Sequence, residues 1–551
     1  MSGEYNVADL VAEFLSACKI STVFGVASVH NLPMLDAIGR RNAIRFIMPR
    51  GEMGGAHMAD GFARASGGLG VVISSTGPGA ANAVGGLVEA RIAGTPVLHL
   101  ASQTFTRLID RDTGAVHDAP DQTGMLRSVS KTSYRIKTPQ QAIGVLTRAV
   151  VDALAPPAGP VSVEIPIDVQ RMAVERPDLN CFEIPLAGPL APTRAELDEM
   201  ARRVLAAKRP LLWIGSGAGG AGDAVHRLLD LGFVMVSSWH GRGIVPDDHP
   251  LNLSGLNGNG MPMIQDFYQT VDLALVVGSR LRAHENGDFA VKLPQNMVQI
   301  DADPLANGRN YANNFFICAD AKLTLEGLIE RIAGKIHVAA GHQDEFRTLR
   351  RKALADYLAQ FGPYATFMEQ LRAVMPKDAI WARDITQSTS TWGNRIFPIY
   401  SPRQNVYPVS AGIGQGLPLA IGAAAAAEGR KTVLLTGDGG FYLNIGELWT
   451  AVQEKLDLVV IVMNDRGYGV IKKLQDQMQG GRHFFADLSG PDLERLAELC
   501  DIPFWRVRRA DAFGATVAEA LKKPGPCLVD VDMTAIGEYP NYFPFNPRPN
   551  A

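Results

Sequence analysis

Short apolar runs rich in Val, Ile and Leu alternate with Ala-rich helical stretches along the whole chain. Clear examples of the apolar runs are Val71–Ser75, Pro96–Ala101, Leu211–Ile214, Leu273–Val277, Thr432–Leu435 and Leu458–Met463. Such alternation is typical of parallel sheets that are covered by helices. The pattern therefore predicts an α/β fold made of doubly wound parallel sheets.

Two breaks in this pattern divide the chain into blocks. The proline-rich stretch Ile184–Thr193 indicates a linker, and a polar, charged stretch at His337–Arg351 precedes the last block. At roughly 100–200 residues per domain, the 551 residues suggest about three domains. We predict three doubly wound parallel-sheet domains, at residues 1–172, 191–335 and 360–551.

Composition and charge exclude several classes of protein. The formal net charge is −3 and no basic block occurs, so nucleic-acid binding is not expected. No run approaches the roughly 18 uninterrupted apolar residues of a membrane span, and the first residues lack the pattern of a secretory signal. The 5 cysteines form no CxxC pair and indicate reduced thiols. We expect a cytoplasmic protein without membrane contact.

The most specific pattern joins two strand ends in the last block. One apolar run is followed by Gly437, Asp438, Gly439 and Gly440, and the next run ends, 26 residues after Asp438, in Asn464 and Asp465. Glycines let the backbone approach a phosphate closely, and the helix that follows points free N–H groups at the anion. Two oxygen ligands from neighbouring strand ends suit Mg²⁺. A GDG turn alone would also fit an ordinary strand–turn–helix, but its combination with the later pair is far more specific.

This combination resembles the GDG and NN motif of the thiamine-diphosphate enzymes of the acetolactate synthase, benzoylformate decarboxylase and pyruvate oxidase group. The resemblance covers essentially the whole chain, in the order pyrimidine-binding, middle and diphosphate-binding domain. It implies thiamine diphosphate and Mg²⁺ as cofactors, with Asp438, Asp465 and the Gly467 carbonyl as metal ligands. The cofactor site implied in this way extends to Tyr468 and Gly469. Asp465 stands where the family usually has Asn, which keeps an oxygen ligand and adds negative charge.

The segment IMPRGEMGGAHMADGFAR resembles the part of the family that carries an activating glutamate, here Glu52. In the family this carboxyl group is hydrogen-bonded to the aminopyrimidine ring and favours its imino tautomer, which removes the C2 proton of the thiazolium to give the ylide. Without that context, a glutamate beside Arg50 would be interpreted as a surface residue. The family's glutamate meets the diphosphate site of another chain, so the resemblance also implies a homodimer or homotetramer with shared sites.

Two further segments of the last block carry the resemblance. YPVSAGIGQGLPLAIGAA is similar to the segment whose bulky apolar residue wedges the cofactor into a bent shape, which places Ile413 at the wedge. An ordinary core isoleucine is the alternative interpretation of this position. DITQSTSTW is similar to the loop that closes over the diphosphate, and it implies contacts from Gln387 and Ser388.

The middle block contains a GxGxxG match from Gly215 to Gly220. A dinucleotide site would require an acidic residue at the end of the next strand, and GFVMVSSW has none, so a nicotinamide dehydrogenase is poorly supported. The block instead resembles the flavin- or ADP-binding middle domain of part of the thiamine family, in which Arg280 would contact a flavin phosphate. Several relatives keep this domain without a nucleotide, so the binding of FAD is left open.

Two histidines fall near the substrate pocket that the resemblance implies. They are His30, in GVASVHNLP, and His117, in VHDAPDQ. Each could be a hydrogen-bonded structural residue, but two histidines near one pocket favour a catalytic role in relaying protons.

The leading hypothesis is a decarboxylase or carboligase that acts on a 2-oxo acid through a C2 ylide and an enamine. The alternative is a C–C lyase or hydrolase of a 2-hydroxy ketone or diketone, which uses the same cofactor and releases no CO₂. A non-catalytic nucleotide-binding regulatory subunit is disfavoured because Glu52 and Asp438 are both present. Acetolactate synthases select their second oxo acid with an Asp-Arg pair and a Trp, whereas this chain has Ala283, His284 and Leu474.

Overall fold

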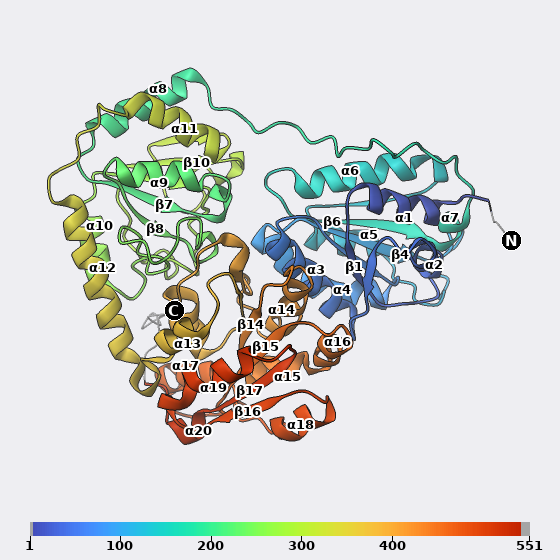
Figure 1. Cartoon of the computed structure of the whole chain (residues 1–551). Helices are drawn as coiled ribbons and strands as arrows, with labels where there is room; N and C mark the ends of the chain where they lie inside the picture. Colours follow the sequence, from blue (N-terminus) through green and yellow to red (C-terminus); the bar gives the residue numbers. More distant parts are fainter. Residues whose placement is uncertain (1–3, 541–551) are drawn as a thin grey trace.

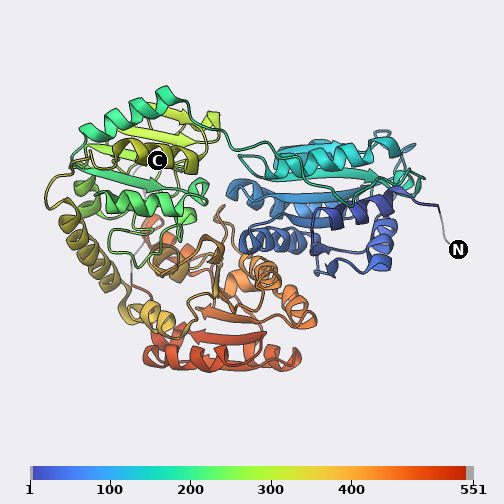
Figure 2. The same ribbon diagram turned by 45° about the horizontal axis from the view of Figure 1, so that its top comes forward.

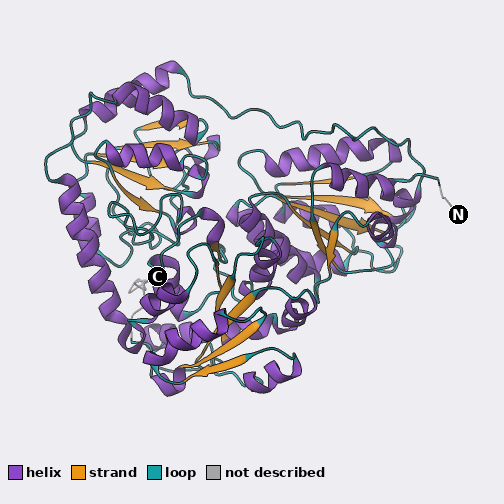
Figure 3. Cartoon of the chain, in the orientation of Figure 1, coloured by secondary structure: helices purple, strands orange, loops and turns teal. Residues whose placement is uncertain are grey.

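The computed structural model describes residues 4–540, which fold into three α/β domains with one sheet each (Figure 1). Every strand pairing in the three sheets is parallel. Helices flank each sheet, as the colouring by secondary structure shows (Figure 3). The prediction of three doubly wound parallel-sheet domains is confirmed.

The N-terminal sheet has the strand order β2-β1-β3-β4-β6-β5. Its strands are β1 (Thr22–Gly25), β2 (Arg45–Ile47), β3 (Gly70–Ser74), β4 (Val97–Gln103), β5 (Thr132–Arg135) and β6 (Pro160–Pro166). Its helices are α1 (Val7–Ala17), α2 (Leu32–Arg41), α3 (Glu52–Ser66), α4 (Pro78–Ala93), α5 (Gln122–Val129), α6 (Ala142–Leu154) and α7 (Ile167–Arg171). The central strands are buried along their whole length, which explains their continuous apolar composition.

An extended segment leads from α7 across to the middle domain (Figure 1). The middle sheet has the order β11-β10-β9-β7-β8. Its strands are β7 (Pro210–Ile214), β8 (Val234–Ser237), β9 (Leu273–Val277), β10 (Met297–Asp301) and β11 (Phe315–Cys318). Its helices are α8 (Arg194–Ala206), α9 (Gly222–Asp230), α10 (Pro262–Tyr268) and α11 (Ala321–Ile332).

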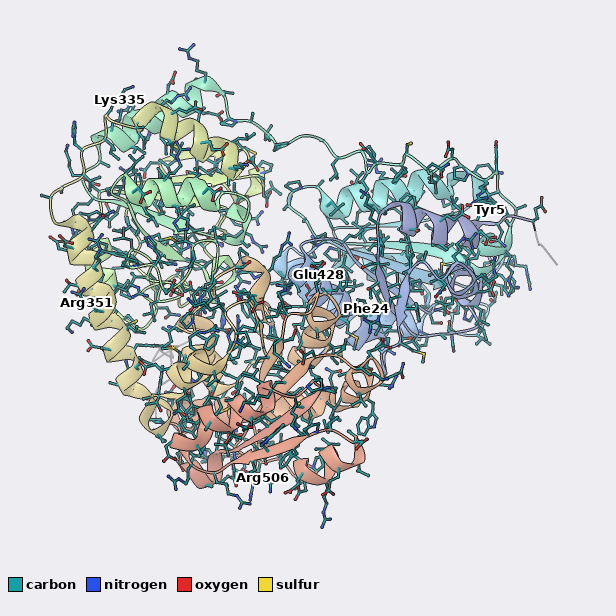
Figure 4. The ribbon with its side chains drawn as sticks, viewed as in Figure 1. Tyr5, Phe24, Lys335, Arg351, Glu428 and Arg506 are labelled. Atoms are coloured by element: carbon teal, nitrogen blue, oxygen red, sulfur yellow. The ribbon has the colours of Figure 1, made fainter. Side chains whose placement is uncertain are left out.

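A long helix, α12 (His342–Leu358), connects the middle domain to the C-terminal domain along the outside of the molecule (Figures 1 and 2). Figure 4 labels Arg351 on this helix, Lys335 on the middle domain and Arg506 on the C-terminal domain. Within residues 4–540, no helix is long and apolar enough to cross a membrane. All 5 cysteines are free.

The C-terminal sheet has the order β13-β12-β14-β15-β17-β16. Its strands are β12 (Ile380–Arg383), β13 (Asn405–Val406), β14 (Thr432–Gly437), β15 (Leu458–Asn464), β16 (Phe504–Val507) and β17 (Cys527–Asp532). Its helices are α13 (Phe367–Val374), α14 (Gly416–Ala425), α15 (Asp438–Leu443), α16 (Leu448–Gln453), α17 (Gly469–Met478), α18 (Leu493–Leu499), α19 (Phe513–Leu521) and α20 (Met533–Ile536).

In each sheet the strand order reverses beside the first strand of that sheet. The reversals lie between β1 and β3, between β7 and β9, and between β12 and β14. Open α/β sheets bind their ligands outside the carboxyl ends of the strands at such a point. The loops that follow these six strands are therefore where binding residues are expected.

The N-terminal and C-terminal domains meet where α3 and α14 cross at very short range (Figure 1). A Cβ atom on Gly61 would lie 2.0 Å from the Leu419 carbonyl oxygen, and one on Gly422 would lie 1.9 Å from the Met58 carbonyl oxygen. Because the two backbones touch, no side chain fits at either position. Buried apolar residues of both helices belong to one core that spans the two domains.

Gly61→Val should therefore destabilise the protein, by about 3 kcal/mol or more, because a backbone carbonyl cannot yield to the new side chain. Thermal or urea unfolding of the purified variant measures the loss. Gly144→Ala is the matched control, since a Cβ atom there meets nothing within 4 Å on helix α6. A Gly61→Val protein as stable as the Gly144→Ala protein would contradict the close crossing.

Candidate functional site

Two carboxylates of the predicted metal site lie at neighbouring strand ends in the C-terminal sheet. Asp438 begins α15 directly after β14, and Asp465 follows β15. These strands are paired in parallel, with Gly437 opposite Met463. The Gly467 N–H donates to Asp438 Oδ2 at 2.9 Å, so the turn after β15 folds back onto Asp438. The structure thus brings together the residues predicted from the GDG motif and the later pair.

The electrostatics of this carboxylate pair favour a cation. Burial raises the pKa of Asp465 to about 7, and the neighbouring Asp438 charge adds to this effect. Burial also raises the pKa of Asp438, although hydrogen bonds, including one shared with Asp465, act in the opposite direction. Asp438 Oδ1 is buried and has no hydrogen-bond partner. Two close carboxylates with an unsatisfied oxygen fit a hard divalent cation with oxygen ligands.

Within residues 4–540, no group of three or more His, Cys, Asp or Glu side chains could hold a metal ion. The predicted ligand set does not need such a group, because it combines two carboxylates with the Gly467 carbonyl. Mg²⁺ commonly completes its octahedral shell with waters and substrate phosphates. The donors at β14 and β15 therefore fit the predicted ion.

Glycines keep the space around these carboxylates open for close contacts. A Cβ atom on Gly439 would lie 2.7 Å from the Tyr468 ring, and one on Gly440 would lie 3.0 Å from the Asp384 carboxyl carbon. On Gly469, the first residue of α17, it would lie 1.8 Å from Asp465 Oδ2 and 2.8 Å from Gln387 Nε2. Gln387 and Asp465 therefore both lie close to Gly469.

A carboxylate that was not predicted, Asp384, organises the loops on the other side of this switch point. It follows β12 and is fully buried, and it accepts hydrogen bonds from the backbone N–H groups of Ile385, Gly414 and Gly416 at 2.6–3.1 Å. Burial raises its pKa to about 6. Ile413, which directly precedes the anchored Gly414, is 41% exposed. This exposure contradicts the alternative interpretation of Ile413 as an ordinary core residue.

Ser388 lies on the same stretch of chain as Gln387 and is fully buried. The residues that follow it form a π-helical turn, Thr389–Gly393, instead of an open loop. The hydroxyl of Tyr539 lies within 3.3 Å of Thr391 Oγ1, so the end of the described chain packs against this turn.

Glu52, the predicted activating residue, is the first residue of α3 and is 9% exposed. Its Oε2 accepts a hydrogen bond from Asn82 Nδ2 at 3.2 Å. A Cβ atom on Gly79 would lie 2.7 Å from Glu52 Oε1, so the carboxylate packs against the first turn of α4. Two elements of the N-terminal domain therefore hold this carboxylate.

The two predicted histidines lie side by side at the switch point of the N-terminal sheet. The ring centroids of His30 and His117 are 5.3 Å apart, although the residues come from different loops. Burial and the nearby His117 lower the pKa of His30, whose Nδ1 is buried without a partner. The His117 carbonyl presses on Gly77, where a Cβ atom would lie 2.1 Å away. Since Gly77 precedes Gly79, the histidine pair adjoins the turn that packs against Glu52.

The site therefore consists of two half-sites. The N-terminal half-site contains Glu52, His30 and His117, and the C-terminal half-site contains Asp438, Asp465, Gly469, Gln387 and Ile413. The contacts described above hold each half-site within its own domain. Exposed apolar side chains lie beside both half-sites: Val29 (58%), Met53 (39%) and Val116 (70%) are sequence neighbours of His30, Glu52 and His117, and Leu443 (52%) lies against Gly414, next to Ile413.

A separate cavity of about 920 Å³ lies at the switch point of the middle sheet. It is lined by the ends of β7, β9 and β10 and by parts of the N-terminal domain. The charged side chains in its lining include the basic Arg91, Lys131, Arg280, Arg309 and Arg403 and the acidic Asp301, Asp303 and Asp320. Arg280 donates to the Ile92 carbonyl at 2.6 Å and so spans the middle and N-terminal domains. Gly215 and Gly217 pack directly against Gly278, so the turn after β7 lies against the turn after β9.

Gly469→Ala should weaken the binding of thiamine diphosphate with Mg²⁺ at least about tenfold, because the new methyl group displaces the Asp465 carboxylate. Isothermal titration or quenching of tryptophan fluorescence measures the affinity. Gly446→Ala is the control in the same domain, since a Cβ atom there makes only an ordinary 3.8 Å contact with Arg50. Wild-type affinity in Gly469→Ala would show that this glycine is not part of the cofactor site.

Comparisons with known proteins agree with this geometry. Residues 5–125 match "Thiamine pyrophosphate enzyme, N-terminal TPP binding domain", residues 197–328 match the central domain, and residues 384–531 match the C-terminal TPP binding domain. The chain is 30% identical to "Acetolactate synthase 1, chloroplastic" of Oryza sativa subsp. japonica, over 95% of this chain and 84% of that protein. It is 32% identical to "Probable 2-ketoarginine decarboxylase" of Pseudomonas aeruginosa, over 85% of this chain and 83% of that protein. The chain belongs to the family of thiamine-diphosphate-dependent enzymes.

Proposed function

We propose that the protein is a thiamine-diphosphate- and Mg²⁺-dependent decarboxylase or carboligase that acts on a 2-oxo acid. The observation that carries this proposal is the pair of half-sites, in which Asp438 and Asp465 form a cation site and Glu52 is held as a buried carboxylate. The names of its relatives include a decarboxylase and acetolactate synthases. The acetolactate selectivity residues are replaced, and His284 instead stacks edge-on against Trp239 at 5.5 Å. We therefore favour a 2-oxo acid decarboxylase over an acetolactate synthase.

Each half-site has a separate task in this proposal. Asp438, Asp465 and the Gly467 carbonyl would hold Mg²⁺ and through it the diphosphate, while Gln387, Ser388 and the glycines at 437–440 would surround the phosphates. When bound, thiamine diphosphate supplies a carbanion that attacks a keto carbon. Glu52 would hold a proton at the aminopyrimidine ring, and the exposed Ile413 would contact the cofactor and support its bent shape.

The Glu52→Gln variant should lose about 10²-fold or more of its turnover, because the amide cannot exchange a proton with the ring. Purified protein would be incubated with 2-oxo acids, 2-hydroxy ketones and cyclic diketones, with and without thiamine diphosphate and Mg²⁺. Proton NMR and CO₂ detection identify the products. Asn82→Ala is the control that removes a neighbour of Glu52 and keeps its carboxylate. Turnover of a 2-oxo acid that survives in Glu52→Gln would contradict the assignment.

The His30 and His117 pair supports the second candidate, a C–C lyase or hydrolase of a 2-hydroxy ketone or diketone. Two adjacent imidazoles, one of them with a lowered pKa and a free Nδ1, are suited to moving protons at a hydroxyl or carbonyl group. In the same panel, cleavage of a ketone without CO₂ would favour this candidate. His30→Ala with unchanged turnover would remove the histidine pair from the mechanism in either case.

We also propose that two copies of the chain share each site. The apolar side chains that lie beside both half-sites are the kind of exposed surface that a partner chain covers. In a twofold dimer, the N-terminal half-site of one copy would face the C-terminal half-site of the other.

Cytoplasmic localisation remains our proposal for the protein.

A mixing experiment tests the shared site. Glu52→Gln and Asp438→Asn should each be inactive alone, but their random mixture, after dissociation and reassembly, should recover about one quarter of wild-type activity. The recovery follows because a mixed dimer has one site with both changes and one site with neither. If each site lay within one chain, the mixture would stay inactive.

The cavity of the middle domain is proposed to bind a nucleotide, either FAD or ADP. Its volume and the basic side chains in its lining, including Arg280, fit a diphosphate-containing ligand. The visible absorbance of the purified protein distinguishes bound flavin from ADP or from an empty cavity.

A further inference from the structure

Three buried ionic side chains of the N-terminal domain form an ion triad at the boundary with the C-terminal domain. Arg64 on α3 donates to Asp60 at 2.5 Å and to Glu89 on α4 at 2.7 Å. The three side chains are at most 5% exposed. Because burying charges is costly even when they are paired, a triad of this kind calls for a reason other than stability.

The triad holds a segment of the C-terminal domain, residues 407–410, by its backbone. Glu89 accepts from the Val409 N–H at 2.7 Å with Oε1 and from the Ser410 N–H at 2.9 Å with Oε2. Arg64 donates to the Tyr407 carbonyl at 2.6 Å. From the middle domain, Arg282 donates to the Val409 carbonyl at 3.1 Å. The 407–410 segment is therefore held by hydrogen bonds from side chains of both other domains.

The segment held by these hydrogen bonds lies just before Ile413 in the chain. The far side of the same loop is fixed by Asp384, which accepts from Gly414 and Gly416. Ile413 thus projects from a loop whose later anchor belongs to its own domain and whose earlier anchor is Glu89 in another domain. We propose that Glu89 is a positioning residue of the thiamine-diphosphate site, which sets the height of Ile413 through the 407–410 segment. This inference rests on the proposed role of Ile413 as the support of the bent cofactor.

A variant of Asp60 distinguishes a positioning role of Glu89 from a contribution of the ion triad to stability alone. It shares Arg64 with Glu89 and is fully buried, but it bonds to Arg64 one turn away on the same helix. Asp60→Asn therefore disturbs the ion triad without removing an acceptor for Val409 or Ser410. Glu89→Asp keeps the buried negative charge beside Arg64, yet its shorter side chain cannot reach both N–H groups. Glu89→Gln removes the charge and places an amide donor opposite one of them.

The experiment compares these three variants with wild-type protein and with Ile413→Ala in two measurements. Amide hydrogen exchange of peptides covering 405–416, followed by mass spectrometry on cofactor-free protein, reports how firmly the hydrogen bonds hold the 407–410 segment. Exchange of the C2 proton of bound thiamine diphosphate, quenched in acid and read by NMR, reports the bent geometry. Thermal unfolding of each variant records the loss of stability.

We expect Glu89→Asp and Glu89→Gln to speed amide exchange in 405–416 and to slow C2 proton exchange between about tenfold and 100-fold, whereas Asp60→Asn lowers only the unfolding temperature. Glu89 variants that match Asp60→Asn in both exchange measurements would overturn the inference. The proposed function fails separately, if wild-type protein does not accelerate C2 exchange. Unchanged C2 exchange in Ile413→Ala would remove the role of Ile413 and with it this inference.

Discussion

The contact between the backbones of α3 and α14 fixes how the N-terminal and C-terminal domains sit in one chain. Gly61 and Gly422 allow it, since each faces a carbonyl oxygen of the other helix at a distance that no Cβ atom tolerates. The same crossing lets Arg64, one turn after Gly61, reach the Tyr407 carbonyl. The buried ion triad thus depends on Gly61 and Gly422. A larger residue at either position would move α3 and α14 apart and separate Arg64 from the Tyr407 carbonyl.

Three carboxylates at the ends of β12, β14 and β15 have different surroundings, and this difference suggests different tasks. Asp384 accepts several backbone N–H groups within its own domain, so it is satisfied by the fold and acts as an anchor. Asp438 and Asp465 face each other, and Asp438 Oδ1 has no partner. Two carboxylates held close together and away from water favour a cation between them. The proposed metal site is therefore supported by this imbalance as well as by the motif.

The sequence predicted the elements of the site that depend on local order along the chain. Gly437–Gly440 and Asp465 each follow a buried strand, so the parallel sheet had to bring them together. Asp384, Glu89 and Arg64 were not predicted as site residues, because their roles arise from distant contacts. Glu89 meets Val409 across 320 positions of sequence, and next to Ala90 and Arg91 it looks like a residue on the solvent face of a helix. The resemblance implied that His30 and His117 lie near one pocket, but only the fold brings these two loops together, with the ring centroids 5.3 Å apart.

The two anchors of the loop that carries Ile413 differ in a way that matters for catalysis. Asp384 belongs to the same domain as Asp438 and Asp465. A shift of another domain would therefore not change the position of this anchor relative to those two carboxylates. Glu89 belongs to the N-terminal domain, and Arg282 belongs to the middle domain, where it adjoins the residues that line the cavity of about 920 Å³. A shift of either domain would therefore act on Ile413 through 407–410 while Asp438 and Asp465 stayed in place. In the proposed site, binding of the diphosphate would thus depend on one domain, and the role of Ile413 would depend on all three.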